Sequence, residues 1–291
     1  MTRDPFQGFP VPPYPSFPLG RNPSFVDLLR AAADSPVPRP ETVVGHGPSQ
    51  LSAPHGTTVL ALKYADGVIM AGDRRAVEGF SIADERIDKV FPADEHSAVA
   101  IAGAAGQATE IDRLFQTELE HYEKVEGDRL SLEGKANRLA QMIRGNFAMA
   151  LQGLVVVPLF AGYDEHRGEG RIFRYDVTGG RWEEADYHAT GSGSSPARGT
   201  LKKRWRPGMD RGAALRAAVE ALYDASQEDA ATGGPDPLRN IFPSVKSISA
   251  DGVQPLESEE VRQAFEAIVG STHEAPRRTG GSQAREREPG P

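Results

Sequence analysis

Two apolar runs joined by an Asp-Gly pair constrain the fold of this chain more than any other feature. The runs are residues 59–62 and 68–71, and the Asp-Gly pair is at 66–67. An Asp-Gly pair between such runs predicts a β-hairpin with a tight turn. The hairpin does not account for the Gly-Thr-Thr sequence at 56–58 that precedes it. We interpret Thr57 as a residue that becomes an N-terminus when the chain is cut.

The composition excludes several classes of site. The chain of 291 residues has no cysteine, which excludes disulfides, thiolate metal sites and a cysteine nucleophile. No apolar run approaches the roughly 20 residues that span a bilayer, and the N-terminus lacks the pattern of a signal peptide. We therefore expect a cytoplasmic protein that does not bind membranes. The net charge of -8 argues against nucleic acid as the main partner.

Residues 1–56 differ in composition from the rest of the chain. They hold 12 of the 23 prolines, and their four basic and four acidic residues cancel. Proline fixes φ and removes a hydrogen-bond donor, so this segment is not expected to form a packed core. One short helix is expected over 24–33, with Ser24 as its cap and Asp27 at the third position. The segment is either a disordered tail or a cleavable leader that docks weakly on a folded body.

Hydrophobic periodicity after residue 57 predicts both strands and helices. Residues 86–91 alternate like a half-buried strand after a turn at Gly79, and residues 97–106 look like a small-residue strand that runs into glycines. The remaining expected strands are 154–163, 172–176, 182–187 and 240–250, and the expected helices are 111–122, 132–151, 211–231 and 261–269. Residues 271–291 have almost no apolar side chains and are expected to be a disordered tail. This order favours an α+β fold in which two antiparallel sheets stack and helices cover their outer faces.

An ordered set of motifs then resembles one known family. The motifs are Gly-Thr-Thr at 56–58, Gly-Asp-Arg-Arg-Ala at 72–76, Lys89, Ala-Gly-Ala-Ala at 102–105, Gly-Ser-Gly at 191–193 and Asp-Ala-Ala-Thr-Gly-Gly at 229–234. In this order and spacing they are similar to the β subunit of the 20S proteasome, more narrowly to the actinobacterial type. The leader sequence at 24–29 also resembles the propeptide of that subgroup. The resemblance covers about residues 57–270, which is essentially the whole predicted folded part.

The resemblance implies a fold, an activity and partners. The fold is the four-layer αββα sandwich of N-terminal nucleophile hydrolases, and the activity is that of a threonine endopeptidase that degrades unfolded proteins without a cofactor or metal. The implied partners are proteasome α subunits, other copies of the chain in heptameric β rings stacked as a 14-mer, and an ATP-dependent unfoldase that acts through the α ring. The implied domains are a propeptide at 1–56, a catalytic domain at 57–270 and the tail at 271–291.

The cleavage site and nucleophile follow from the chemistry of threonine. A threonine hydroxyl is a poor nucleophile until a base takes its proton. The α-amino group of the same residue is a suitable base, because its ordinary pKa of about 7.7–8.0 leaves a neutral fraction at neutral pH. That amine exists only after the bond between Gly56 and Thr57 is cut. Glycine at position 56 leaves the carbonyl of this bond unshielded.

The resemblance assigns roles to six more residues of the catalytic site. Asp73 and Lys89 form the ion pair that activates the Thr57 hydroxyl. Arg75 is not one of the six, and we expect it to support this ion pair rather than to perform chemistry. The apolar neighbours Ile87 and Phe91 are expected on the same side of a strand as Lys89, where burial lowers the pKa of its amine. The other roles are an oxyanion donor, the backbone N–H at Gly103, and three residues that hold the freed amine and a water: Ser192, Asp229 and Thr232. The family often has serine where Thr232 stands, and threonine keeps the hydroxyl.

Six positions match those that bind the substrate in the family. Val77 stands where many active β subunits carry threonine or serine, but the family uses the main chain there. The others are expected to line a pocket for an apolar side chain, since all are small or apolar: Ala76, Ile87, Ile101, Ala105 and Ala108.

Two other functions remain open at this stage. One is a different N-terminal nucleophile amidohydrolase that acts on a small amide, and the other is a non-catalytic subunit that serves ring assembly. A non-catalytic subunit should lack the Gly-Thr junction or the Asp73–Lys89 pair, and this chain has both. A small-amide hydrolase should lack the long paired helices expected over 105–151.

Overall fold

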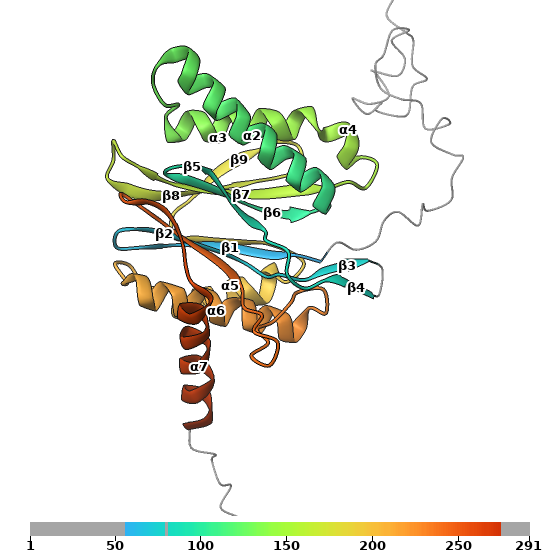
Figure 1. Ribbon diagram of the computed structural model, residues 1–291, viewed down its shortest axis with the longest axis vertical. Coiled ribbons are helices and arrows are strands. Elements are labelled where there is room, and N and C mark those ends of the chain that lie inside the picture. Colours follow the sequence, from blue (N-terminus) through green and yellow to red (C-terminus); the bar gives the residue numbers. More distant parts are fainter. Residues whose placement is uncertain (1–55, 79–80, 275–291) are drawn as a thin grey trace, which may run out of the picture. The chain divides into compact units, whose positions relative to one another are not determined.

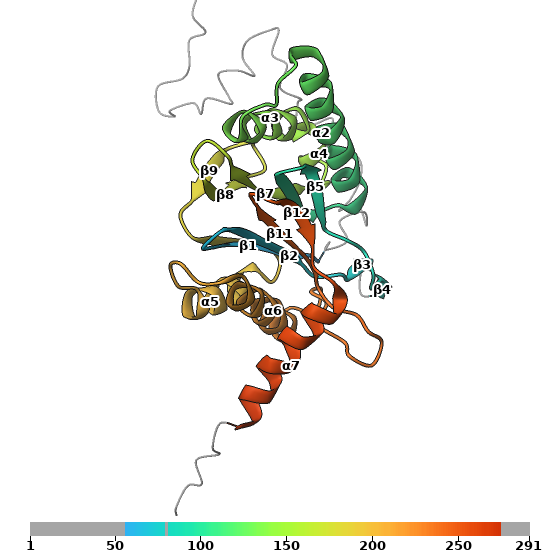
Figure 2. The ribbon, with the colours of Figure 1, turned by 60° about the vertical axis from the view of Figure 1, so that its left-hand side comes forward.

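The computed structural model describes residues 56–78 and 81–274, which form four layers (Figure 1). Two five-stranded antiparallel sheets lie face to face in the middle, and helices cover the outer face of each sheet. This arrangement confirms the predicted α+β sandwich. The view turned by 60° shows the same order of layers (Figure 2).

The first sheet holds the predicted hairpin. Its strands, in spatial order, are β10 (Tyr187–Gly191), β1 (Thr58–Tyr64), β2 (Gly67–Gly72), β11 (Ser244–Ser249) and β12 (Gly252–Pro255). Tyr64 pairs with Gly67, so the turn residues are Ala65 and Asp66, one position earlier than predicted. Neither turn residue has a positive φ. The hairpin prediction is therefore confirmed, but Asp-Gly does not form the turn itself, because Gly67 already belongs to β2.

The second sheet faces the first and has a simple up-and-down order. Its strands are β5 (Val90–Asp94), β6 (Ser97–Gly103), β7 (Val156–Asp164), β8 (Glu169–Tyr175) and β9 (Arg181–Glu184). A short hairpin that the sequence did not predict, β3 (Ala76–Glu78) with β4 (Ser81–Asp84), leads from the first sheet to the second.

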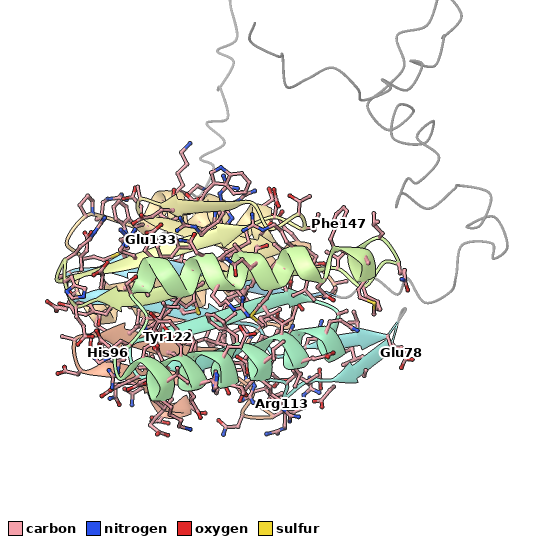
Figure 3. All side chains as sticks on the ribbon, turned by 90° about the horizontal axis from the view of Figure 1, so that it is seen from above. Glu78, His96, Arg113, Tyr122, Glu133 and Phe147 are labelled. Carbon is pink, nitrogen blue, oxygen red and sulfur yellow. The ribbon has the colours of Figure 1, made fainter. Side chains whose placement is uncertain are left out.

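In the part of the chain that the structure describes, three helices lie on each side of the sandwich. The helices over the second sheet are α2 (Ala105–Glu126), α3 (Leu132–Gly145) and α4 (Phe147–Ala150), and those on the other side are α5 (Ser194–Arg204), α6 (Arg211–Glu228) and α7 (Ser258–Glu274). Figure 3 looks down on the upper layer, where α2, with Arg113 and Tyr122, runs beside α3. Ser131 caps α3 by accepting a hydrogen bond from the N–H group of Gly134.

Strand β1 explains why both faces of its sheet are covered. Val59 and Ala61 pack between the two sheets with residues of β6 and β7. Leu60 and Leu62 face the opposite way and pack against α5 and α6. Successive strand residues point to opposite faces, so a strand that is apolar at every position must be buried on both sides. The continuous apolar run at 59–62 is thus the sequence signature of an inner strand in a four-layer fold.

Two predicted elements are shorter than expected. Residues 86–89 form no strand, and β5 begins only at Val90. The reason is that the neighbouring strand β6 pairs with β5 from Val90 onward. The helix predicted over 132–151 ends at Gly145, since the N–H group of Asn146 turns back to the carbonyl groups of the last turn.

The structure differs from the sequence prediction at two other helices. Helix α5 was not predicted, and α7 continues to Glu274, four residues beyond the predicted end of the folded part. No proline interrupts the chain until Pro276, so the helical pattern had no clear stop signal at Gly270. The predicted helix at 24–33 and the turn at Gly79 lie outside the described residues.

Candidate active site

Thr57 lies at the start of β1, and the sheet fixes its position. The next residue, Thr58, pairs with Gly191 of β10, and the N–H group of Ser192 donates to the Thr57 carbonyl oxygen at 3.0 Å. Gly191 has φ +101°, and a Cβ atom there would lie 1.8 Å from that carbonyl oxygen. Only glycine fits this approach. The hydroxyl of Thr57 is buried and donates to the carbonyl oxygen of Gly56 at 2.8 Å.

Gly56 is confined as closely as the residue that follows it. A Cβ atom at this position would lie 1.8 Å from the Cβ atom of Ala231 and 2.6 Å from its carbonyl oxygen. Real side chains do not approach backbone atoms this closely, so any larger residue would displace the chain. The bond between Gly56 and Thr57 therefore passes through a space that only glycine fits.

Asp73 follows β2 directly and is fully buried. One carboxylate oxygen accepts from the Lys89 ammonium at 2.7 Å and from the N–H group of Thr58 at 2.8 Å. The other accepts from the N–H groups of Arg75 at 3.0 Å and Gly233 at 2.9 Å. Buried charges need such a complete set of partners. Asp73 thus joins the start of β1 to the lysine and to the loop after α6.

Lys89 is buried beside the bond that Thr57 would attack. Besides Asp73, its Nζ atom donates to the carbonyl oxygen of Arg75 at 2.6 Å and of Gly56 at 3.4 Å. Burial lowers the pKa of the Lys89 amine, and the Asp73 carboxylate opposes that shift. A lysine with a lowered pKa exchanges a proton more readily at neutral pH, and its ammonium form polarises the Gly56 carbonyl group.

A second cluster contacts Thr57 through Ser192. Asp229 accepts from the hydroxyl of Ser192 at 2.5 Å, the hydroxyl of Thr232 at 2.6 Å and the N–H group of Ala231 at 3.1 Å. Burial works against ionisation of Asp229, but these hydrogen bonds outweigh it and hold the pKa of the carboxyl group below its usual range. Asp229 is therefore a carboxylate at neutral pH. Ser192 links it to Thr57, because its hydroxyl donates to Asp229 and its N–H group donates to the Thr57 carbonyl oxygen.

The structure brings together six of the seven residues predicted to be catalytic: Thr57, Asp73, Lys89, Ser192, Asp229 and Thr232. Arg75 joins the two clusters, since its guanidinium donates to the Ala230 carbonyl oxygen at 3.0 Å. Gly103 ends β6 with φ +132°, where a Cβ atom would lie 2.0 Å from the Val155 carbonyl oxygen. Within the described residues no hydrogen bond joins Gly103 to Thr57. The oxyanion role of Gly103 stays a prediction.

The six predicted substrate-binding residues do not share one open surface. Ile101 and Ala108 are buried in the apolar core between the second sheet and its helices. Ala76 and Val77 lie in β3 and are partly exposed, as is Ile87. Ala105 is the first residue of α2. The substrate roles of these residues stay predictions.

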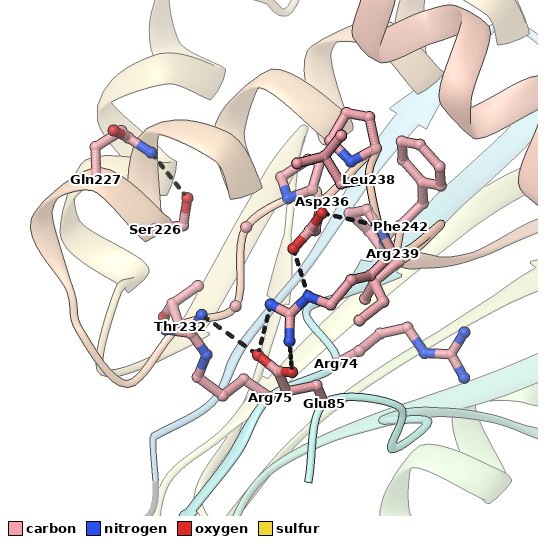
Figure 4. A pocket seen from close by; sticks show the side chains of 16 residues that line it. Arg74, Arg75, Glu85, Ser226, Gln227, Thr232, Asp236, Leu238, Arg239 and Phe242 are labelled. Atoms are coloured by element: carbon pink, nitrogen blue, oxygen red, sulfur yellow. Dashed lines mark hydrogen bonds and ion pairs between the residues drawn. The ribbon is translucent and has the colours of Figure 1, made fainter. Parts of the chain in front are cut away.

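A pocket of about 320 Å³ lies next to Thr232 and Gly233 (Figure 4). Its wall is mixed. Apolar side chains such as Leu238, Ile241 and Phe242 line it beside Arg239, which pairs with Glu85 and with Asp236. The two other arginines that line it are Arg74 and Arg75. The Nε atoms of these two arginines are buried without a hydrogen-bond partner. This pocket does not match the apolar one that the sequence predicted.

The sequence prediction missed one residue of the site, Thr58. This side chain is fully buried, and its hydroxyl contacts Thr232 and the N–H group of Gly193. The signal was available, because a threonine at the start of an otherwise apolar inner strand must bury its hydroxyl. Among residues 56–78 and 81–274, no group of acidic or histidine side chains is placed to hold a metal ion. No helix in those ranges is long and apolar enough to cross a bilayer.

Comparison with known proteins identifies the family to which the chain belongs. A family model described as Proteasome subunit matches residues 53–236. A proteasome subunit beta of Acidimicrobium ferrooxidans is 57% identical over 241 residues, which cover 83% of this chain and 87% of that protein. A proteasome subunit beta of Acidothermus cellulolyticus is 54% identical over 251 residues, covering 84% and 86%. The chain therefore belongs to the proteasome subunit family.

Proposed function

We propose that this chain is a catalytic β subunit of a proteasome core particle, a threonine endopeptidase that exposes its own nucleophile. The observation that carries the proposal is the position of the Thr57 hydroxyl, 2.8 Å from the Gly56 carbonyl oxygen. Lys89 donates to the same oxygen and is paired with Asp73. The similarity to proteins called proteasome subunit beta supports the peptidase class.

The first reaction is the removal of residues 1–56. The Thr57 oxygen attacks the Gly56 carbonyl carbon, and its proton passes through Lys89 to the Thr57 nitrogen as the C–N bond breaks. The product is an ester between Gly56 and the Thr57 side chain, which water hydrolyses to a Gly56 carboxylate and a free Thr57. The reaction needs no second molecule other than water, because the hydroxyl and the bond are already adjacent. In this proposal, the catalytic domain begins at Thr57, and its last helix continues past residue 270 to Glu274.

The second reaction is the hydrolysis of polypeptide substrates. The freed Thr57 amine accepts the hydroxyl proton with the help of the Lys89 charge, and the oxygen attacks the substrate carbonyl carbon. The substrate amine leaves with that proton, and water then hydrolyses the resulting ester. Asp229, Ser192 and Thr232 hold the amine, while the backbone N–H at Gly103 stabilises the oxyanion. Of the predicted substrate-binding residues, the partly exposed Ala76, Val77 and Ile87 contact the substrate chain.

The proposal extends to partners and location. The subunit assembles with α subunits and with copies of itself in heptameric rings stacked as a 14-mer. An ATP-dependent unfoldase supplies unfolded chains through the α ring in the cytoplasm. Heterologous contacts between identical subunits form a closed ring when the successive rotations from one subunit to the next add up to a full turn.

The decisive experiment measures the N-terminus of the purified chain by mass spectrometry. Wild type should begin at Thr57, while Thr57→Ala should keep residues 1–56 and hydrolyse no peptide. The matched control is Thr200→Ala, since Thr200 is a buried threonine that donates to Asp224 between α5 and α6. This control should be trimmed like wild type. Normal trimming of Thr57→Ala in particles made only of that variant would refute self-cleavage, and a trimmed but inactive wild type would favour an assembly role.

A further inference from the structure

We propose that Thr58 is a positioning residue that fixes the nucleophile between the two clusters of the site. The inference rests on the proposed function, because it concerns the same reaction. Thr58 follows Thr57 in the chain and makes hydrogen bonds toward both clusters through its backbone and its hydroxyl. None of the roles given above to the residues of the site belongs to it.

The hydroxyl of Thr58 is fully buried and has two partners. It accepts from the N–H group of Gly193 at 3.0 Å, and its oxygen lies 2.7 Å from the Thr232 hydroxyl oxygen. A Cβ atom at position 193 would lie 2.5 Å from the Thr58 oxygen, so glycine there permits the close approach. The Thr58 hydroxyl therefore ties β1 to the corner that carries Ser192.

Counting hydrogens sets the direction of these bonds. Thr232 has one hydroxyl hydrogen, and it donates this to Asp229 at 2.6 Å. Asp229 is ionised because its pKa is low, so it can only accept. The hydrogen between Thr58 and Thr232 must therefore come from Thr58. The chain runs from the Gly193 N–H group to Thr58, then to Thr232 and finally to the Asp229 carboxylate.

The consequence is a fixed orientation for Thr232. A hydroxyl that donates to one partner and accepts from another cannot rotate without losing a buried hydrogen bond. Without the Thr58 hydroxyl, Thr232 keeps its hydrogen bond to Asp229 but loses the donor that fixes the orientation of its hydroxyl group. The buried N–H group of Gly193 would also lose its acceptor. Both changes occur next to the place where the Thr57 amine is freed.

The backbone of Thr58 is held just as firmly by the other cluster. Its N–H group donates to Asp73 at 2.8 Å, and its carbonyl oxygen accepts from the N–H group of Asp73 at 3.0 Å. The same Asp73 oxygen accepts from Lys89. A shift of Thr58 would thus move Thr57 relative to Lys89 and to Asp229 together. Misplacement by about 1 Å can cost roughly a hundredfold in rate.

The experiment compares three variants in the assembled full-length protein. Thr58→Val keeps the branched shape without the hydroxyl, Thr58→Ser keeps the hydroxyl, and Thr200→Val removes a buried hydroxyl away from the site. A covalent inhibitor of N-terminal threonine titrates the active sites, so that kcat is given for each competent site. For Thr58→Val we expect kcat to fall about tenfold or more with KM within about twofold, and slower loss of residues 1–56. Thr58→Ser should retain kcat within about threefold, and Thr200→Val should match wild type.

Several outcomes would overturn the proposal. An unchanged kcat in Thr58→Val would show that the hydroxyl has no part in positioning, and an equal loss in Thr58→Ser would show that the volume of the side chain matters instead. Should Thr58→Val fail to assemble, Thr58→Cys has a similar size and only a weak hydrogen-bonding group. Wild-type kcat in that variant would also overturn the inference. A wild type that stays unprocessed and inactive would refute the proposed function, and the role of Thr58 with it.

Discussion

Lys89 donates to three oxygen atoms that belong to three different parts of the site, namely Asp73, Arg75 and Gly56. If Lys89 transfers the proton of the nucleophile, Lys89→Arg should lose nearly all peptide hydrolysis. A guanidinium does not release its proton at neutral pH, and its planar fork does not fit a site built around one ammonium. Lys89→Ala should fail as well, because it leaves the buried Asp73 carboxylate without its cation.

The measurement is hydrolysis of a short peptide with an apolar residue before the cut bond, by particles in which Thr57 was exposed without self-cleavage. Lys246→Arg is the control, since burial also lowers the pKa of Lys246 but that lysine lies in β11. Activity of Lys89→Arg within about tenfold of wild type, or about 1.4 kcal/mol in the barrier, would contradict the catalytic assignment and leave Lys89 a structural partner of Asp73.

A second prediction at this scale concerns Gly56. Gly56→Ala should stop or strongly slow the removal of the leader, because the added methyl group would overlap the Cβ atom of Ala231. Gly199→Ala is the matched control, since a Cβ atom there meets nothing within 4 Å. A time course of intact mass after synthesis distinguishes the two variants. Equal processing rates would show that the chain around Gly56 yields more easily than its packing suggests.

Some residues of the site could be predicted from the sequence, and others could not. Thr57 was predicted from the Gly-Thr junction, and Asp73 and Lys89 from the family resemblance; the structure brings the three together. Thr58 was not predicted, because its role depends on Thr232, which lies 174 positions away in the sequence. A pattern within one strand shows that a hydroxyl is buried but does not show which group accepts or donates.

At the scale of elements, Arg171 in β8 joins four parts of the second sheet and its helix layer. It is buried and donates to Asp164 of β7 at 3.0 Å, to Glu133 of α3 at 2.7 Å and to Glu183 of β9 at 2.5 and 2.8 Å. Arg171→Leu should lower the free energy of unfolding at pH 7 by about 3 kcal/mol, since it leaves carboxylates without their cation. Arg262→Leu is the control on the surface of α7, where exposed ion pairs contribute little.

The same cluster predicts a dependence of stability on pH. Hydrogen bonds from Arg171 hold the pKa of Asp164 and of Glu183 below the usual values, against the effect of burial. A lowered pKa in the folded state adds stability above the pKa of the unfolded state, and this is lost as the pH falls through the folded value. Wild type should therefore lose stability below about pH 4.5, and Arg171→Leu should lose less over the same range. Urea unfolding at several pH values tests this, and parallel curves would contradict it.

Elements with a strong apolar period were predicted well, and those without one were not. Strand β1 and helix α2 have clear patterns and were found. Helix α5 buries only Ala197, Thr200 and Leu201, and it contains a proline and a glycine. Its position depends on packing against α6 and β10, and this packing leaves no periodic pattern in the sequence of the helix. The segment 86–89 shows the opposite error, because its alternation suggested a strand, but regular pairing with β6 starts only at Val90.

At the scale of the whole molecule, large apolar side chains remain exposed on the described surface. The most exposed is Leu238, at 98%, followed by Leu151, Val125, Ile82 and Leu114. Leu238 lies in a turn that Asp236 holds in place through its pairing with Ile241 and its hydrogen bonds to Arg239. We predict that Leu238, the most exposed of these side chains, lies in a subunit contact, where its burial against a neighbouring subunit would stabilise the assembly.

Leu238→Asp should therefore reduce assembly of the particle without lowering the stability of the free subunit. The side chain is almost fully exposed, so the melting temperature of the unassembled chain should not change. Light scattering with an α-type partner present gives the mass of the complexes, and Asp251→Asn in the turn before β12 is the control. Full assembly of Leu238→Asp would show that this residue lies outside the subunit contacts.

The close approach of Gly56 to Ala231 has a consequence for inhibitor chemistry. Gly56 precedes the bond that the chain would cut in itself, and it has no room for a side chain. A peptidase for varied polypeptides must accept side chains at the equivalent residue of each substrate. The leader and a substrate must then reach the same hydroxyl along different backbone paths. A compound that copies the leader should accordingly be a poor template for blocking turnover, while compounds that copy substrates should leave maturation largely untouched.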